Sequence, residues 1–212
     1  MLKRAVIFDF DGTIADSLPA AIQVFEELTA RPERFSAAQI ESFRDLSVPE
    51  LIRALGIPKW KVPVLMVKGR KMLRDHLYGI PAHKGMHDLL AALYEQEIPL
   101  YVLSSNSTEN VHSYLQRHKL TQYFSGIYGG ASLLGKAPLI LKMIKKEQLE
   151  TEGSWYVGDE VRDVSAARAV GLHIASVSWG YNTHGALATK KPDAIVDTAE
   201  ELQKLLEQAW KK

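Results

Sequence analysis

Short apolar runs alternate with amphipathic segments along most of the chain. Runs that are apolar at consecutive positions and end in Gly, Asp or Ser are typical of strands buried on both faces of a parallel sheet. We interpret six segments in this way: AVIFDF from residue 5, PLYVLS (99–104), SGIYGG (125–130), SWYVGD (154–159), LHIASVS (172–178) and DAIVD (193–197). Helix-period segments lie between them, for example 108–120 and 138–148. The last helix-period segment of the chain follows a capping box formed by Thr198 and Glu201. The alternation predicts an α/β fold with a doubly wound parallel sheet.

Residues 16–84 break this alternation, because they contain helix signals and no convincing strand. Helix starts are indicated by Ser-Leu-Pro at 17–19 and by Ser-Val-Pro-Glu at 47–50, and an amphipathic stretch covers 62–78. We therefore expect a small helical cap at 16–84, inserted after the first strand of a core made of 1–15 and 85–212. Such a cap over the active edge of the sheet could act as a lid.

Composition and charge exclude several classes of protein. The 212 residues carry a formal net charge of +1, which gives no global electrostatic reason to expect nucleic acid or an anionic membrane as partner. The absence of cysteine excludes a disulfide framework, a thiolate metal site and a cysteine nucleophile. No apolar run is long enough for a signal-peptide core or a membrane span, so we expect a cytoplasmic protein, with monomer or homodimer left open.

Two acids, Asp9 and Asp11, follow the first predicted strand in the pentapeptide DFDGT. The carboxyl ends of the strands are where ligands bind to an open parallel sheet. Two carboxylates so close together repel, and burying both requires a bound cation or a shared proton. Such a pair also occurs in ordinary turns, so its interpretation depends on what the other strand ends contribute.

Polar residues that suit an anion follow the second and third predicted strands. Ser105 and Asn106 stand just before a helix, where hydroxyl groups and helix N-terminal amides form an anion site. Lys136 precedes a helix that opens with Pro138, and its ammonium could neutralise a phosphate and the charge that develops in a transition state. Each of these residues is unremarkable alone, because serines cap helices and lysines are usually solvated.

Two further acids, Asp159 and Asp163, follow the fourth predicted strand and begin a helix. Their spacing places both carboxylates on one side of the first helical turn, at the same edge of the sheet. Acids at a helix N-terminus also interact favourably with the helix dipole, which would account for Asp163 alone. The convergence of four acids and a lysine indicates a catalytic or metal site. Glu160 adds an acid whose role stays open.

These residues, in this order, resemble the four motifs of the haloacid dehalogenase superfamily, in particular its capped phosphatases similar to phosphoglycolate phosphatase. DFDGT resembles the first motif, Ser105 with Asn106 the second, Lys136 the third and GDEVRD (158–163) the fourth. The helical block resembles the family's cap, and SWGYN (178–182) resembles a loop common in the phosphoglycolate type. One departure is Ala137, where many members have proline directly after the lysine.

The resemblance implies a role for each of these residues. Asp9 would be the nucleophile and Asp11 the acid and base in the hydrolysis of a small phosphorylated metabolite. Ser105, Asn106 and Lys136 would hold the phosphate. Mg²⁺ would be bound by a set of oxygen ligands: the carboxylates of Asp9 and Asp159, the backbone carbonyl of Asp11, and Asp163 either directly or through a water molecule. In the cap, Arg44 is our candidate for pairing with a second anionic group on the substrate.

Two alternatives remain at this stage. A sugar-phosphate mutase of the β-phosphoglucomutase type would use the same core motifs and a similar cap. The stretch GASLLGK (130–136) also fits G-x-x-x-x-G-K of a nucleotide-binding P-loop. Ala137 then stands where the P-loop has serine or threonine, and a P-loop would leave DFDGT without a role.

Overall fold

A single six-stranded parallel sheet forms the centre of the molecule. The structure is a computed structural model that describes residues 2–30, 33–76, 79–130 and 135–211. The strands are β1 (Val6–Phe8), β2 (Leu100–Leu103), β3 (Gly126–Tyr128), β4 (Trp155–Gly158), β5 (His173–Val177) and β6 (Ala194–Val196). They lie in the order β3-β2-β1-β4-β5-β6 with every neighbouring pair parallel. The predicted doubly wound α/β fold is confirmed. Its strand order reverses between β1 and β4, the position at which such sheets bind ligands.

Helices cover both faces of this sheet. The helices that follow or connect the strands are α5 (Met86–Glu95), α6 (Thr108–Arg117), α7 (Ala137–Glu147), α8 (Val161–Ala169), α9 (His184–Ala188) and α10 (Ala199–Trp210), with a 3₁₀ turn η3 (Thr121–Tyr123). Successive side chains of a strand point to opposite faces. Val6 and Phe8 accordingly pack with residues of α5, α6 and α10, whereas Ile7 packs with residues of α7 and α8. Burial on both faces explains why the strands are apolar without alternation.

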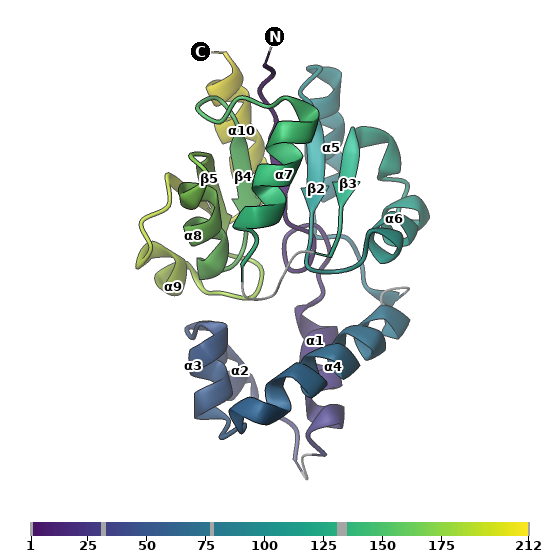
Figure 1. The fold of residues 1–212 in the computed structure, drawn as a ribbon, viewed down its shortest axis with the longest axis vertical. Helices are drawn as coiled ribbons and strands as arrows, with labels where there is room; N and C mark the ends of the chain where they lie inside the picture. The colour runs from purple at the N-terminus through teal and green to yellow at the C-terminus, as the bar shows by residue number, and fades with distance from the viewer. Residues whose placement is uncertain (1, 31–32, 77–78, 131–134, 212) are drawn as a thin grey trace.

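Between β1 and α5 the chain forms a separate group of helices. They are α1 (Leu18–Leu28), α2 (Ala37–Arg44), α3 (Val48–Ala54) and α4 (Val62–His76), with a 3₁₀ turn η1 (Lys59–Lys61). Figure 1 places them beyond the end of the sheet toward which the arrowheads of β2 and β3 point, so they lie over its carboxyl edge. The helical insertion is confirmed, while the domain boundaries at 15/16 and 84/85 stay predictions. None of the helices in the described ranges is long and apolar enough to cross a membrane.

Candidate active site and metal centre

Asp9 lies directly after β1, at the switch point of the sheet. Its backbone amide donates to the Val157 carbonyl of β4 at 2.8 Å, which extends the β1–β4 pairing by one residue. The Oδ1 atom accepts the Phe10 amide at 2.8 Å, and Oδ2 accepts the Lys136 ammonium at 2.5 Å. The side chain is buried, and burial raises the pKa of Asp9 to about 7 although Lys136 acts to lower it.

Lys136 is one of the largest fully buried side chains of the protein. Besides Asp9, its ammonium contacts Asp163 Oδ1 at 2.7 Å. Burial by itself would lower the pKa of Lys136, but the Asp163 and Asp9 carboxylates outweigh it and hold the pKa well above its usual value. A lysine that is usually solvated is therefore a fixed charge inside the site, with both neighbouring acids oriented toward it.

Asp159, directly after β4, is held by groups from two other segments. Its Oδ1 accepts the Thr13 hydroxyl at 2.8 Å, and Oδ2 accepts the Tyr181 amide at 2.7 Å. Burial, followed by the charge of Asp9, raises the pKa of Asp159 well above its usual value. Gly180 is required beside it, because a Cβ atom there would lie 2.2 Å from Asp159 Oδ2. The loop 179–182 thus fixes the direction of this carboxylate.

Asp163 is in the first turn of α8 and is completely buried. Its Oδ2 accepts the Glu160 amide at 3.1 Å, which leaves Oδ1 directed at Lys136. Glu160, whose role the sequence leaves open, is buried next to it and pairs with Arg162. The two acids at the start of α8 therefore have different partners, because Asp163 contacts Lys136 and Glu160 contacts Arg162.

Three carboxylates meet where these strands end. One oxygen from each of Asp9, Asp159 and Asp163 lies within 4.8 Å of the others. The donor set is all oxygen, and burial followed by neighbouring carboxylates raises the pKa of Asp159, while burial raises that of Asp9 despite Lys136. Mg²⁺ prefers oxygen ligands, and a buried carboxylate cluster is stabilised by a cation. These residues fit a divalent metal ion, whereas the predicted ligand role of the Asp11 backbone carbonyl stays a prediction.

Asp11 lies two residues beyond Asp9, and its side chain is half-buried. Its Oδ1 is buried with no hydrogen-bond partner in the part of the chain that the structure describes. Burial raises the pKa of Asp11 to about 6, with Lys136 acting in the opposite direction. Gly12 then turns the chain with φ of 77°, and a Cβ atom on it would lie 2.2 Å from Asp159 Oδ2. The turn therefore places Asp11, whose Oδ1 has no partner among the described residues, close to the buried Asp159.

The segment after β2 is adjacent, because β2 pairs with β1. Ser105 has a buried hydroxyl with no partner among the described residues, as a ligand-binding hydroxyl would. Ser104 Oγ accepts the Asn106 amide at 2.9 Å. Asn106 Oδ1 accepts the Ser107 amide and the Asn110 side-chain amide, each at 2.9 Å, so this oxygen braces the start of α6. Of the two predicted phosphate ligands on this segment, Ser105 has the more available side chain.

Arg44, at the end of α2, connects the helical group to the core. Its Nε and Nη2 donate to the carbonyls of Gly180 and Ser178 at 3.2 and 2.9 Å, and Nη1 donates to Glu41 at 2.9 Å. Asn182 Nδ2 returns a hydrogen bond to the Arg44 carbonyl at 2.8 Å. The proposed pairing of Arg44 with substrate stays a prediction, but the guanidinium is already bound to the loop that holds Asp159.

Sequence reasoning missed the residues that orient the acids. Thr13 belongs to DFDGT and Tyr181 to SWGYN, yet neither pattern indicates a bond to Asp159. The glycine at position 180 could have indicated such a contact, because a glycine often stands where the backbone closely approaches another group. The stretch that resembles a P-loop, 130–136, includes residues 131–134, which lie outside the described residues.

A parallel sheet with buried acids and a buried lysine at its switch point is the arrangement of an α/β enzyme whose site lies at the carboxyl edge of the sheet. The model of the haloacid dehalogenase-like hydrolases matches residues 6–177, and the chain belongs to this family.

Among curated proteins, it is 34% identical to the phosphoglycolate phosphatase of Synechococcus elongatus over 94% of this chain and 95% of the relative. It is 29% identical to the phosphoglycolate phosphatase of Pseudomonas fluorescens, over 95% and 79% of the two chains. A solved haloacid dehalogenase-like hydrolase from Streptococcus pneumoniae has the same fold, with a TM-score of 0.79 and 24% identity over 96% of this chain and 98% of the other.

The raised pKa values predict how stability depends on pH. The pKa of Asp9 is about 7 and that of Asp11 about 6, against an ordinary value of 3.8. Such carboxyl groups stabilise the fold while protonated; this contribution is complete below the unfolded pKa and is lost as the pH rises through the folded pKa. We expect the free energy of unfolding of the metal-free protein to fall by a few kcal/mol between about pH 4 and pH 8. Denaturant titrations in EDTA measure this free energy of unfolding. A steady rise in the free energy over this pH range would contradict the prediction.

Proposed function

We propose that the protein is a Mg²⁺-dependent phosphatase that hydrolyses a phosphate monoester of a small metabolite through an aspartyl-phosphate on Asp9. The observation that carries the proposal is the buried cluster of Asp9, Asp159 and Asp163, with Lys136 bound to two of them and Asp11 beside them. The activity named for the curated relatives, phosphoglycolate phosphatase, supports the same reaction class.

In the first step, a carboxylate oxygen of Asp9 attacks phosphorus and the bond from phosphorus to the alcohol oxygen breaks. The electron pair of that bond stays on the alcohol oxygen, which takes the proton of the Asp11 carboxyl group. Asp9 is held for attack by the Phe10 amide and Lys136. Asp11 suits the donor role because its pKa of about 6 keeps part of it protonated near neutral pH.

In the second step, Asp11 acts in the reverse direction. Its carboxylate takes a proton from a water molecule whose oxygen attacks phosphorus, and the bond between phosphorus and Asp9 breaks. Inorganic phosphate leaves and Asp9 returns as a carboxylate. Lys136 and Ser105 hold the phosphoryl oxygens through both steps, since preorganised donors stabilise the charge that develops there.

Mg²⁺ would be held by Asp9, Asp159 and Asp163, where its charge favours the ionised form of Asp9 and neutralises the phosphoryl oxygens. The chain prepares this site through Thr13 and Tyr181, which fix the two oxygens of Asp159. The helical group would act as the lid and select the substrate.

Metal dependence tests the proposal directly. With saturating Mg²⁺, p-nitrophenyl phosphate should release inorganic phosphate, and EDTA should reduce turnover by about 100-fold or more, because the clustered acids then lack their cation. Adding Mg²⁺ back should restore turnover. Equal turnover with and without EDTA would contradict the metal role. Conversion of β-glucose 1-phosphate to the 6-phosphate with little free phosphate would favour the mutase instead.

A further inference from the structure

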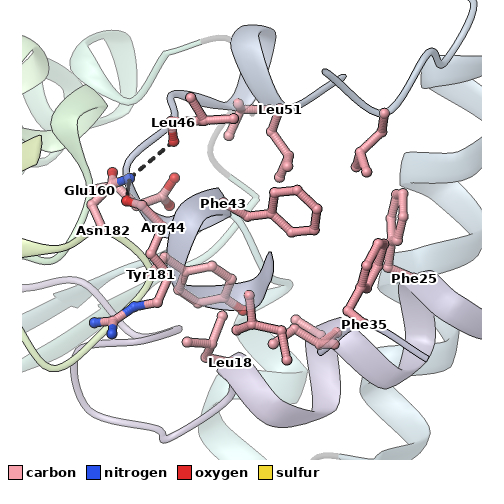
Figure 2. Close-up of a pocket in the computed structure, with 15 residues that line it drawn as sticks. Leu18, Phe25, Phe35, Phe43, Arg44, Leu46, Leu51, Glu160, Tyr181 and Asn182 are labelled. Carbon is pink, nitrogen blue, oxygen red and sulfur yellow. Dashed lines mark hydrogen bonds between the residues drawn. The ribbon is translucent and has the colours of Figure 1, made fainter. Parts of the chain in front are cut away.

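A cavity of about 190 Å³ lies between the helical group and the core. Figure 2 shows it, with side chains of α1, α2 and α3 on one side and the 160 and 181–182 segments on the other. Its apolar lining includes Leu18, Ile22, Phe25, Phe35, Phe43 and Leu46. A second apolar cavity of about 250 Å³ inside the helical group shares lining residues with it, among them Phe25 and Leu51.

Tyr181 forms part of the wall between this cavity and the reacting groups. Its backbone amide binds Asp159, and its side chain lines the cavity. The Tyr181 hydroxyl lies 3.2 Å from Ser17 Oγ, which in turn accepts the amide of Gly12 at 3.1 Å. Gly12 directly follows Asp11, the proposed proton donor to the leaving group. Tyr181 and Ser17 therefore lie between the cavity and the turn that carries Asp11, the group that the leaving alcohol must meet.

The polar residues of the lining are already engaged. Besides Tyr181, they are Arg44, Glu160 and Asn182. Each guanidinium nitrogen of Arg44 donates to a protein oxygen, and in Figure 2 the guanidinium points away from the aromatic side chains. Glu160 pairs with Arg162. Asn182 donates to the carbonyls of Arg44 and Leu46 and accepts the Val161 amide. An anionic leaving group would lose its hydration here without gaining a cation that is not already bound to protein.

We propose that this cavity binds the leaving group and that the preferred substrates are phosphate monoesters of aliphatic or aromatic alcohols rather than of short hydroxy acids. The inference rests on the phosphatase function proposed above and gives its substrate class. A dry apolar cavity of roughly 150 Å³ holds a benzene ring in another protein, so the volume here suffices for a phenyl or butyl group. Arg44 then has the role of holding the helical group on the core.

A series of alkyl phosphates tests this substrate class. Ethyl, butyl and hexyl phosphate have leaving groups of nearly equal reactivity, so kcat/KM compares their binding in the transition state. We expect kcat/KM to rise by about fourfold per methylene, which corresponds to about 0.8 kcal/mol for a buried methylene, until the cavity is filled. We also expect 2-phosphoglycolate to be a poorer substrate than butyl phosphate. A kcat/KM that does not depend on chain length, or a preference for 2-phosphoglycolate over every alkyl ester, would overturn the proposal.

Binding provides a second measurement that does not need turnover. Hexylphosphonate cannot be hydrolysed and should bind at least about tenfold more tightly than ethylphosphonate in the presence of Mg²⁺. If no ester, p-nitrophenyl phosphate included, releases phosphate while hexylphosphonate keeps this advantage, the phosphatase function fails and the apolar cavity stands. If esters are hydrolysed while the two phosphonates bind equally, the cavity proposal fails and the phosphatase stands.

Charge placed inside the cavity should remove the chain-length effect. Ile22→Lys introduces an ammonium group into the lining and should reduce the ratio of kcat/KM for hexyl over ethyl phosphate by about tenfold or more. Val67→Lys is the matched control, because Val67 belongs to the same group of helices but is 70% exposed. Leu46→Asn, which keeps the branched shape and the number of heavy atoms of the side chain, is the alternative variant if Ile22→Lys does not fold. An unchanged ratio in a folded Ile22→Lys or Leu46→Asn protein would contradict the proposal.

Discussion

Replacing Asp9 by asparagine should lower turnover of p-nitrophenyl phosphate by about 1000-fold or more while the protein stays folded. The amide keeps the shape of the side chain but cannot act as the nucleophile, and removing a covalent nucleophile has effects of this size or larger in other enzymes. The change also relieves a buried charge, because the pKa of Asp9 near 7 indicates that the site favours the neutral form. The metal-free Asp9→Asn protein should therefore be at least as stable as the parent protein at pH 8.

Two measurements separate a lost nucleophile from a lost fold. Steady-state turnover with saturating Mg²⁺ measures the loss of the nucleophile, and thermal unfolding in EDTA at pH 8 measures any loss of stability. Asp88→Asn is the matched control, since Asp88 is an exposed acid in the first turn of α5 and should leave both unchanged. Turnover of a folded Asp9→Asn protein near the parent value would require a different nucleophile. A large loss of stability would give Asp9 a structural role that the proposal does not include.

The sequence predicted the sheet well because its strands are buried on both faces. Each of the six apolar runs contains an observed strand, although the strands are only three to five residues long. The helix start predicted from Ser47, Pro49 and Glu50 is confirmed, because α3 begins at Val48 after a capping box of Ser47 and Glu50. The equivalent box at Ser36 and Gln39, which begins α2, is present in the sequence and was missed. Local patterns of this kind act within one turn and can be recognised without the fold.

The convergence of the acids was predictable for a different reason. Parallel strands end at one edge, so Asp9 after β1 and Asp159 after β4 had to approach each other once the two strands paired. Their partners follow no such rule. Tyr181 reaches Asp159 from a loop 22 residues further along the chain. Asn182 reaches the Arg44 carbonyl across 138 residues. The fold of the core brings Tyr181 to Asp159, and the packing of the helical group on the core brings Arg44 to Asn182. No spacing in the sequence encodes either contact.

The burial of Lys136 is another feature that the sequence does not reveal. The sequence suggests a lysine before a helix that could bind phosphate, and it gives no sign that the side chain is 1% exposed and bound to Asp9 and Asp163. Burial changes the role that the residue can have. A solvated lysine contributes one charge to a ligand, whereas this lysine also neutralises two acids that would otherwise repel each other.

Lys136→Met should therefore remove activity and destabilise the metal-free protein by about 3–5 kcal/mol at pH 8, the usual cost when one partner of a buried ion pair is removed. The loss should be smaller at pH 5, because Asp9 then takes up a proton instead of remaining as an uncompensated charge. Lys142→Met is the matched control, since Lys142 lies on the same helix and is exposed. Denaturant unfolding at both pH values, with and without Mg²⁺, measures the effect, and Mg²⁺ should recover part of the stability because it binds the same carboxylates. If Lys136→Met and Lys142→Met had equal stability at pH 8, the buried ion pairs would contribute little, and the loss of activity would have to come from contact with the phosphate alone.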